Sequence, residues 1–357
     1  MKKPLVHAVA SLAGCCLLAP AFAQGTSVVN LYGIMDNGVT RIDNLGGANS
    51  LQLRSGNLLT SRFGLRGSED LGGGLKANFN LEAGITADTG ATSSPFFNRQ
   101  SWVGLSSASF GDITLGRVLP TISDVFVLSM QASYLGNTAA AMDGGAQGAG
   151  SSVARFNNMI GGTRVDNTIK YQSPSFSGFK LHAMASLGEV PGSSSAGRML
   201  SAAASYSSEN IEAGLAYHER QCTEAAGCGA GKAKDQIVGL GAAYKLNGAR
   251  YAMYYTRQEN ALNVQGNNAD VLSLMAQVPV GAWLLGGGLQ FQNDRTALNQ
   301  DARQLNLAAK YLLSKRTQLY AIYAHQSVKN GGKAGMYSVT SGSGTQNQLS
   351  AGIMHVF

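Results

Sequence analysis

The feature that most constrains the fold of this sequence is a period-two alternation of apolar and polar residues. Over residues 75–85 the apolar side chains occupy the odd positions, whereas lysine, asparagine and glutamate occupy even positions. The same pattern returns over 304–311 and, less cleanly, in the last segment of the chain. Because successive side chains of a strand point to opposite faces, each such segment is expected to be a strand with one apolar and one polar face.

The lengths of the connections between strands separate a membrane barrel from a soluble sandwich. Seven short turns are predicted, and eight longer loops rich in glycine, asparagine and serine alternate with them. Fifteen connections join sixteen strands of about ten residues, which suits tilted strands that cross an apolar band of ~25 Å. The turns lie near 69–74, 106–112, 173–178, 207–210, 246–248, 279–281 and 313–316, and the loops near 41–57, 87–97, 119–163, 188–197, 221–234, 259–268, 294–301 and 328–344.

We therefore predict an all-β protein, a 16-stranded antiparallel transmembrane β-barrel. Closure of such a sheet leaves no strand edge exposed to lipid, and sixteen strands enclose a lumen wide enough for water. The composition agrees, because only 13% of the residues are charged and 46 of the 357 are glycine. From Val28 onward no 18 consecutive residues are apolar, which argues against a membrane-spanning helix in that part of the chain.

Residues 1–23 are predicted to be a secretory signal peptide, which leaves 24–357 as the barrel. Lys2 and Lys3 precede an apolar run over 9–19, and an A-x-A site ends at Ala23, after which we expect cleavage. An alternative is a lipoprotein-processing box over 12–15, which would leave a lipidated Cys15. Both readings send the chain out of the cytoplasm.

The mature chain would keep two cysteines, Cys222 and Cys228. In an oxidising compartment this spacing predicts a disulfide that closes a small loop, and a pair of free thiols is the alternative. A metal site would need more ligands than this loop offers.

The segment GLGAAY at 239–244 lacks the full dinucleotide fingerprint, so no cofactor is predicted. The net charge of +7 suits anionic solutes or acidic lipid, and no basic run indicates nucleic-acid binding.

The chain ends on Phe357, which shares its parity with Leu349, Ala351 and Ile353. This pattern is compatible with an ordinary terminal strand. A terminal aromatic residue on the lipid-facing parity is also what a barrel-assembly machinery would dock, and we expect Phe357 to act as that signal.

Five segments resemble the general-diffusion porins of betaproteobacteria, of the Bordetella, Burkholderia and Comamonas type. They are LYGIMD at 31–36, the segments 61–85, 97–117 and 164–179, and the terminal GIMHVF. The resemblance implies a homotrimer in the outer membrane, in contact with its lipid and lipopolysaccharide. It also implies passive diffusion of small hydrophilic solutes and ions, and a third long loop, 119–163, that folds inward to narrow the pore.

Parity places several arginines on the lumen side. Outward Phe63 and Leu65 turn Arg62 and Arg66 inward, and an outward Trp102 would turn Arg99 inward. Outward Val165, Ile169 and Tyr171 would do the same for Arg164.

The resemblance assigns Arg62, Arg99 and Arg164 to the basic side of the constriction. They could alternatively be solvated strand residues that pair with Glu82 or Asp166. The facing loop offers only Asp124 and Asp143, so the pore is predicted to prefer anions. Further pore-lining candidates are Arg66, Glu82, Arg117, Asp124, Asp143 and Asp166.

An enzyme is not expected. The mature histidines, His182, His218, His325 and His355, fall on different predicted strands without a nearby Ser/Asp constellation. The competing hypothesis is a barrel or sandwich that serves as an adhesin, or a barrel lipolytic enzyme. Conductance would separate a channel from both.

Overall fold

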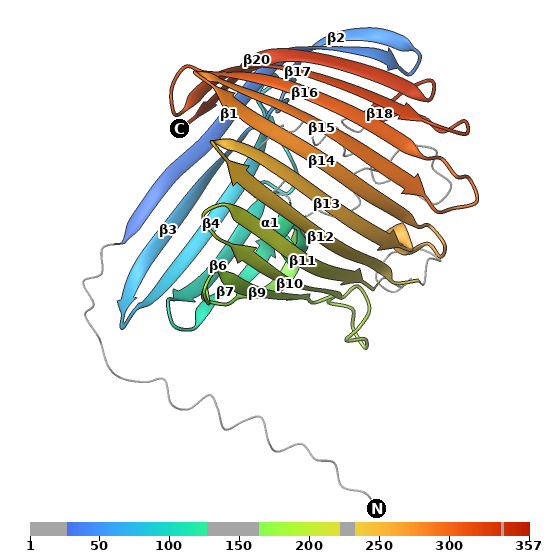
Figure 1. Cartoon of the computed structure of the whole chain (residues 1–357). Coiled ribbons are helices and arrows are strands. Elements are labelled where there is room, and N and C mark those ends of the chain that lie inside the picture. The colour runs from blue at the N-terminus through green and yellow to red at the C-terminus, as the bar shows by residue number, and fades with distance from the viewer. Residues whose placement is uncertain (1–26, 127–163, 222–232, 337–338) are drawn as a thin grey trace, which may run out of the picture.

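The alternating segments form strands that pair edge to edge until the last strand meets the first. The computed structural model describes residues 27–126, 164–221, 233–336 and 339–357 (Figure 1). These residues form a closed barrel of 16 antiparallel strands, which confirms the predicted fold class. No helix among them is long and apolar enough to cross a membrane.

The strands follow one another around the barrel in chain order, as Figure 1 shows. They are β1 (Val28–Leu45), β2 (Ala48–Ser55) continued by β3 (Arg62–Gly72), β4 (Leu75–Thr86), β6 (Gln100–Ser107), β7 (Gly111–Val118), β8 (Val165–Gln172), β9 (Phe179–Ser186), β10 (Met199–Ser207), β11 (Ile211–Arg220), β12 (Asp235–Leu246), β13 (Ala249–Glu259), β14 (Ala269–Val280), β15 (Trp283–Asp294), β16 (Ala302–Leu312), β17 (Thr317–Val328) and β20 (Thr345–Val356). Short β5 (Ala91–Thr92), β18 (Gly335–Met336), β19 (Val339–Thr340) and the 3-10 turn η5 (Ala261–Asn263) lie in the longer loops.

The first long loop was predicted over 41–57, and the structure corrects this. β1 continues to Leu45, turns at Gly46 and Gly47, and returns as β2, which pairs with β1 along its length apart from one irregularity between Ile42 and Leu45. Both glycines have positive φ, 58° and 101°, which a tight turn of this kind requires. Extending the ladder satisfies backbone groups that a loop would leave to water.

The barrel closes where β1 pairs with β20, from Ile34 opposite Val356 to Ile42 opposite Gln348. Beyond this ladder, Gly33 and Phe357 exchange two backbone hydrogen bonds of 3.0 and 3.1 Å. The Phe357 ring lies over Gly33, where any Cβ would overlap it. The terminal residue therefore completes the seam, and its role as an assembly signal stays a prediction.

The two faces of the wall differ in polarity, as the alternation requires. Leucines on β12 and β15 point outward and are 44–47% exposed at Leu240, Leu285 and Leu289. The inner face carries buried amides that bridge strands: Gln326 donates to Gln304 at 2.8 Å. Apolar outside and polar inside is the arrangement of a barrel surrounded by lipid.

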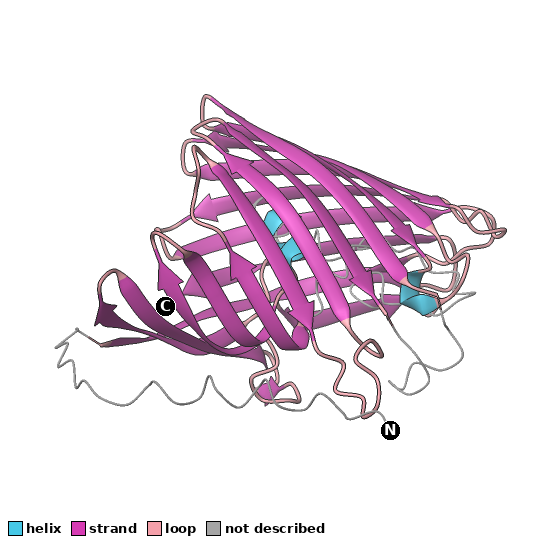
Figure 2. Cartoon of the chain, turned by 90° about the horizontal axis from the view of Figure 1, so that it is seen from below, coloured by secondary structure: helices cyan, strands magenta, loops and turns pink. Residues whose placement is uncertain are grey.

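The third long loop begins with α1 (Thr121–Phe126), which lies inside the barrel (Figures 1 and 2). Thr121 shares a hydrogen bond with the inward-facing Ser201 of β10, and Val125 packs where a Cβ on Gly214 of β11 would lie. Residues 127–163 lie outside the described residues, so narrowing of the lumen by the whole loop stays a prediction.

Candidate functional site

The three arginines predicted at the constriction lie on one wall, which β3, β4 and β6 to β8 form. Arg62 is the first residue of β3, whereas Arg99 and Arg164 immediately precede β6 and β8. β6, β7 and β8 have 8 residues each, and β12, β14 and β15 on the other side have 12. Because the strands share a rim of short turns, the long-loop ends of the shorter strands lie deeper in the barrel. The arginines are therefore set below the rim of the longer strands.

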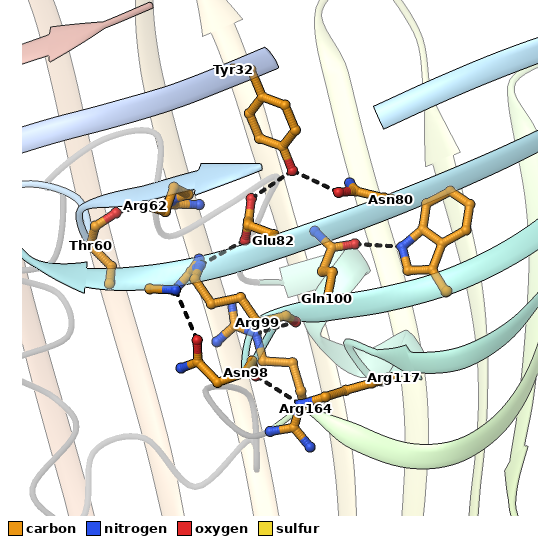
Figure 3. A network of polar contacts seen from close by, with 12 residues as sticks. Tyr32, Thr60, Arg62, Asn80, Glu82, Asn98, Arg99, Gln100, Arg117 and Arg164 are labelled. Carbon is orange, nitrogen blue, oxygen red and sulfur yellow. Dashed lines mark hydrogen bonds and ion pairs between the residues drawn. The ribbon is translucent and has the colours of Figure 1, made fainter. Parts of the chain in front are cut away.

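Glu82 on β4 is the carboxylate at the centre of this wall (Figure 3). Its Oε1 accepts a hydrogen bond from Arg99 Nε at 2.6 Å, and its Oε2 accepts one from the Tyr32 hydroxyl at 3.0 Å. The Arg99 and Glu82 side chains are only 9% and 5% exposed. A charge-assisted bond between buried groups is strong, and it fixes the orientation of the Arg99 side chain.

Arg62 and Arg164 flank Arg99 and are oriented by backbone carbonyls. Arg62 Nε donates to Thr60 O at 2.8 Å, and Arg164 Nε donates to Arg99 O at 3.1 Å. Within the described part of the chain, Arg62 makes no ion pair. Burial, and then the charge of Arg99, lower the pKa of Arg164 to about 9, which still leaves it protonated at neutral pH.

Arg117, whose parity is ambiguous in the sequence, joins the same wall from the end of β7. Its Nε donates to Asn98 O at 2.7 Å, and its Nη1 lies 2.5 Å from Asp166 Oδ1. The Asp166 side chain is 62% exposed, so this pair is weaker than the buried pair at Glu82. The described wall thus carries four guanidinium groups and two carboxylates, so its net charge is positive. The arginines are Arg62, Arg99, Arg117 and Arg164, and the carboxylates are Glu82 and Asp166.

Of the other predicted pore residues, Arg66 borders this cluster, whereas Asp124 pairs elsewhere. Arg66 sits further along β3, with its guanidinium 5.0 Å from the centre of the Tyr32 ring. Asp124 on α1 forms an ion pair with Lys170 of β8. Burial raises the pKa of Asp124, and the nearby Lys170 opposes this. Asp143, Cys222 and Cys228 lie outside the described residues.

The expectation that Trp102 faces lipid is wrong. Val103 and Leu105 are the outward residues of β6, at 57% and 42% exposure. Trp102 pairs with the inward-facing Asn80 in the ladder and donates from Nε1 to Gln100 at 2.8 Å. Arg99 still reaches Glu82 because it precedes β6, where the alternation has not begun.

Two residues of this wall are absent from the sequence-based prediction. Tyr32 lies on the inward parity of β1, which alternation could have identified. Asn98 lies in the loop before β6 and ties this loop to β4, because its Oδ1 accepts a hydrogen bond from Gly84 N at 2.8 Å. No periodic signal marks such a residue.

The described histidines do not assemble a catalytic group. His182 Nε2 lies 3.0 Å from Ser205 Oγ, yet its buried Nδ1 has no hydrogen-bond partner. A Ser-His-Asp triad needs a carboxylate at that nitrogen. Across the described ranges, no three His, Cys, Asp or Glu side chains gather as metal ligands would.

Comparison with known proteins places this wall in context. The family model for Gram-negative porins matches residues 8–331. "Outer membrane porin protein 32" of Delftia acidovorans is 31% identical over the full length of both chains. The structure of an anion-selective porin from Comamonas acidovorans superposes with a TM-score of 0.77, at 28% identity, and covers 93% of this chain and 100% of its own. A trimer form of OmpT from Vibrio cholerae, at 15% identity, gives 0.66 over 93% of this chain and 100% of its own.

Proposed function

Since the chain belongs to the Gram-negative porin family and is an outer-membrane porin, we propose that Arg62, Arg99 and Arg164 form the basic side of its constriction and make the channel anion-preferring. The observation that supports this proposal is that four guanidinium groups and only two carboxylates lie together on the described wall. Arginine stays charged at neutral pH and presents several donors to a passing anion. Low-dielectric walls screen such charges less than an open surface does.

The anion selectivity named for the Comamonas acidovorans structure supports this proposal, as that relative covers nearly the whole barrel. The relatives and the fold are those of channels rather than enzymes, and we propose no catalytic role for this chain. Small hydrophilic or anionic solutes would pass through the lumen by diffusion.

Purified protein added to a planar phospholipid bilayer should produce stepwise, ohmic increases in conductance. The expected reason is a water-filled lumen that needs no energy source. A heat-denatured aliquot of the same preparation is the control. A folded barrel that never conducts would reject the channel and favour an adhesin with long loops.

We also propose that three copies assemble, because the outer wall is broadly apolar and a trimer form is known for OmpT of Vibrio cholerae. Unboiled protein should migrate in SDS near three times the mature mass and collapse to the monomer on boiling. Cross-linking in mild detergent gives an independent count of subunits. A strictly monomeric barrel in both measurements would contradict the trimer.

Cleavage after Ala23, with the barrel over 24–357, remains a proposal, and so does the disulfide between Cys222 and Cys228, which lie outside the described residues. Docking of Phe357 on the assembly machinery is likewise a proposal. The intact mass of unreduced mature protein, before and after thiol alkylation, reports the first two.

A further inference from the structure

A cavity of about 330 Å³ opens on the outside of the barrel, at the long-loop end of β13 to β16. Its floor is apolar and aromatic, formed by Tyr255, Leu272 and Phe291. These residues and Arg303 lie directly opposite one another in successive strands, so they share one face of the sheet. That face is the outer one, because Phe291 is 36% exposed, and Leu289 and Leu285, which follow it on the same side of β15, are 45% and 44% exposed.

The rim of this cavity carries two available cations. The Arg303 side chain is exposed and has no ion pair or hydrogen bond among the described residues. Lys329 is 59% exposed, and its amine lies 3.8 Å from Asp301, which is long for an ion pair. The other lining carboxylate, Asp270, is already engaged by Arg295 at 3.5 Å. An anionic group at the rim would therefore meet Arg303 and Lys329 first.

Below the cavity the same outer face is purely apolar. Met253, Leu274 and Leu289 are 45%, 41% and 45% exposed, and they lie in register on β13, β14 and β15. Aromatic side chains between an apolar band and a charged rim mark the membrane interface in barrels of this kind. The cavity thus sits where acyl chains give way to head groups.

We propose that this cavity binds a phosphorylated head group of lipopolysaccharide, with the phosphate on Arg303 and Lys329 and the first acyl carbons on Tyr255, Leu272 and Phe291. The inference rests on the proposed porin function, which puts the long-loop rim in the outer leaflet, where this glycolipid resides. A free phosphate would use only the rim. The continuous apolar floor and wall favour an amphipathic occupant.

The test compares two double variants of barrels refolded without lipopolysaccharide. Arg303→Ala with Lys329→Ala removes both rim cations from the β16–β17 hairpin. The control, Lys315→Ala with Arg316→Ala, removes one lysine and one arginine from the exposed short turn of the same hairpin. Native mass spectrometry in detergent would follow titration with purified lipid A and with its dephosphorylated form.

The rim variant should bind phosphorylated lipid A about 30-fold more weakly than wild type, whereas the control should bind normally. Dephosphorylated lipid A should bind wild type as weakly as the variant binds the phosphorylated form. Equal affinity of the rim variant and wild type, or an equal loss in the control, would overturn the site. The same preparations should conduct normally in bilayers, so a conducting barrel without lipid binding rejects this site and leaves the proposed function intact.

Discussion

Replacing Arg62, Arg99 and Arg164 together by glutamine should convert the channel from anion preference to cation preference. The described wall would then keep one guanidinium, that of Arg117, opposite two carboxylates, those of Glu82 and Asp166. Glutamine is chosen because its amide can still donate to Glu82, which is buried and would otherwise lose its strongest partner. Reversal potentials across a KCl gradient measure the change directly.

We expect the chloride-to-potassium permeability ratio to fall on the order of tenfold at low salt, with a smaller change at high salt because of screening. The matched control neutralises three exposed arginines of the outer face and short turns, Arg257, Arg303 and Arg316, and should leave the ratio unchanged. Cation preference in the unmodified channel would show that the constriction has been assigned to the wrong residues.

The strand number and the two faces of the wall could be predicted from the sequence because lipid and water impose them residue by residue. A strand such as β4 must alternate when one face meets lipid, so Glu82 falls inward without any knowledge of its partners. The connections between strands are harder to predict. The segment 41–57 has the composition of a loop, yet Gly46 and Gly47 let it fold back as a hairpin.

The arginine wall shows more clearly that alternation alone does not predict where side chains outside the strands point. Arg99 was expected to face inward because Trp102 was placed outward, but Trp102 faces the lumen. The position of Arg99 depends instead on Glu82, which is 17 residues away in sequence, and on the loop that precedes β6. Alternation describes residues inside strands, whereas Arg99, Asn98 and Arg164 lie at strand ends. There, tertiary contacts decide the direction of a side chain.

Asp36 stabilises a bend in the barrel wall that no sequence pattern predicts. Residues 56–61 leave the sheet between β2 and β3, and the bend ends at Arg62. Asp36 Oδ2 accepts hydrogen bonds from Leu58 N at 2.6 Å and Leu59 N at 2.7 Å. Its Oδ1 accepts one from the Tyr320 hydroxyl at 2.6 Å, across the seam on β17. One fully buried carboxylate therefore ties the bend, β1 and β17 together.

Asp36→Ala should destabilise the barrel by on the order of 3–9 kcal/mol, because it removes the acceptor of three buried or partly buried hydrogen bonds at about 1–3 kcal/mol each. The temperature at which unboiled protein loses its folded mobility in SDS should fall clearly. Asp36→Asn keeps one carbonyl oxygen and should lose less, and Tyr320→Phe, which removes a single donor, should lose least. Since the bend leads directly into Arg62, Asp36→Ala should also weaken anion preference in the barrels that still fold. An unchanged melting temperature in Asp36→Ala, or a larger loss in Tyr320→Phe, would mean that the bend is held by its other bonds. These include the one from Thr40 Oγ1 to Asn57 Oδ1 at 2.9 Å.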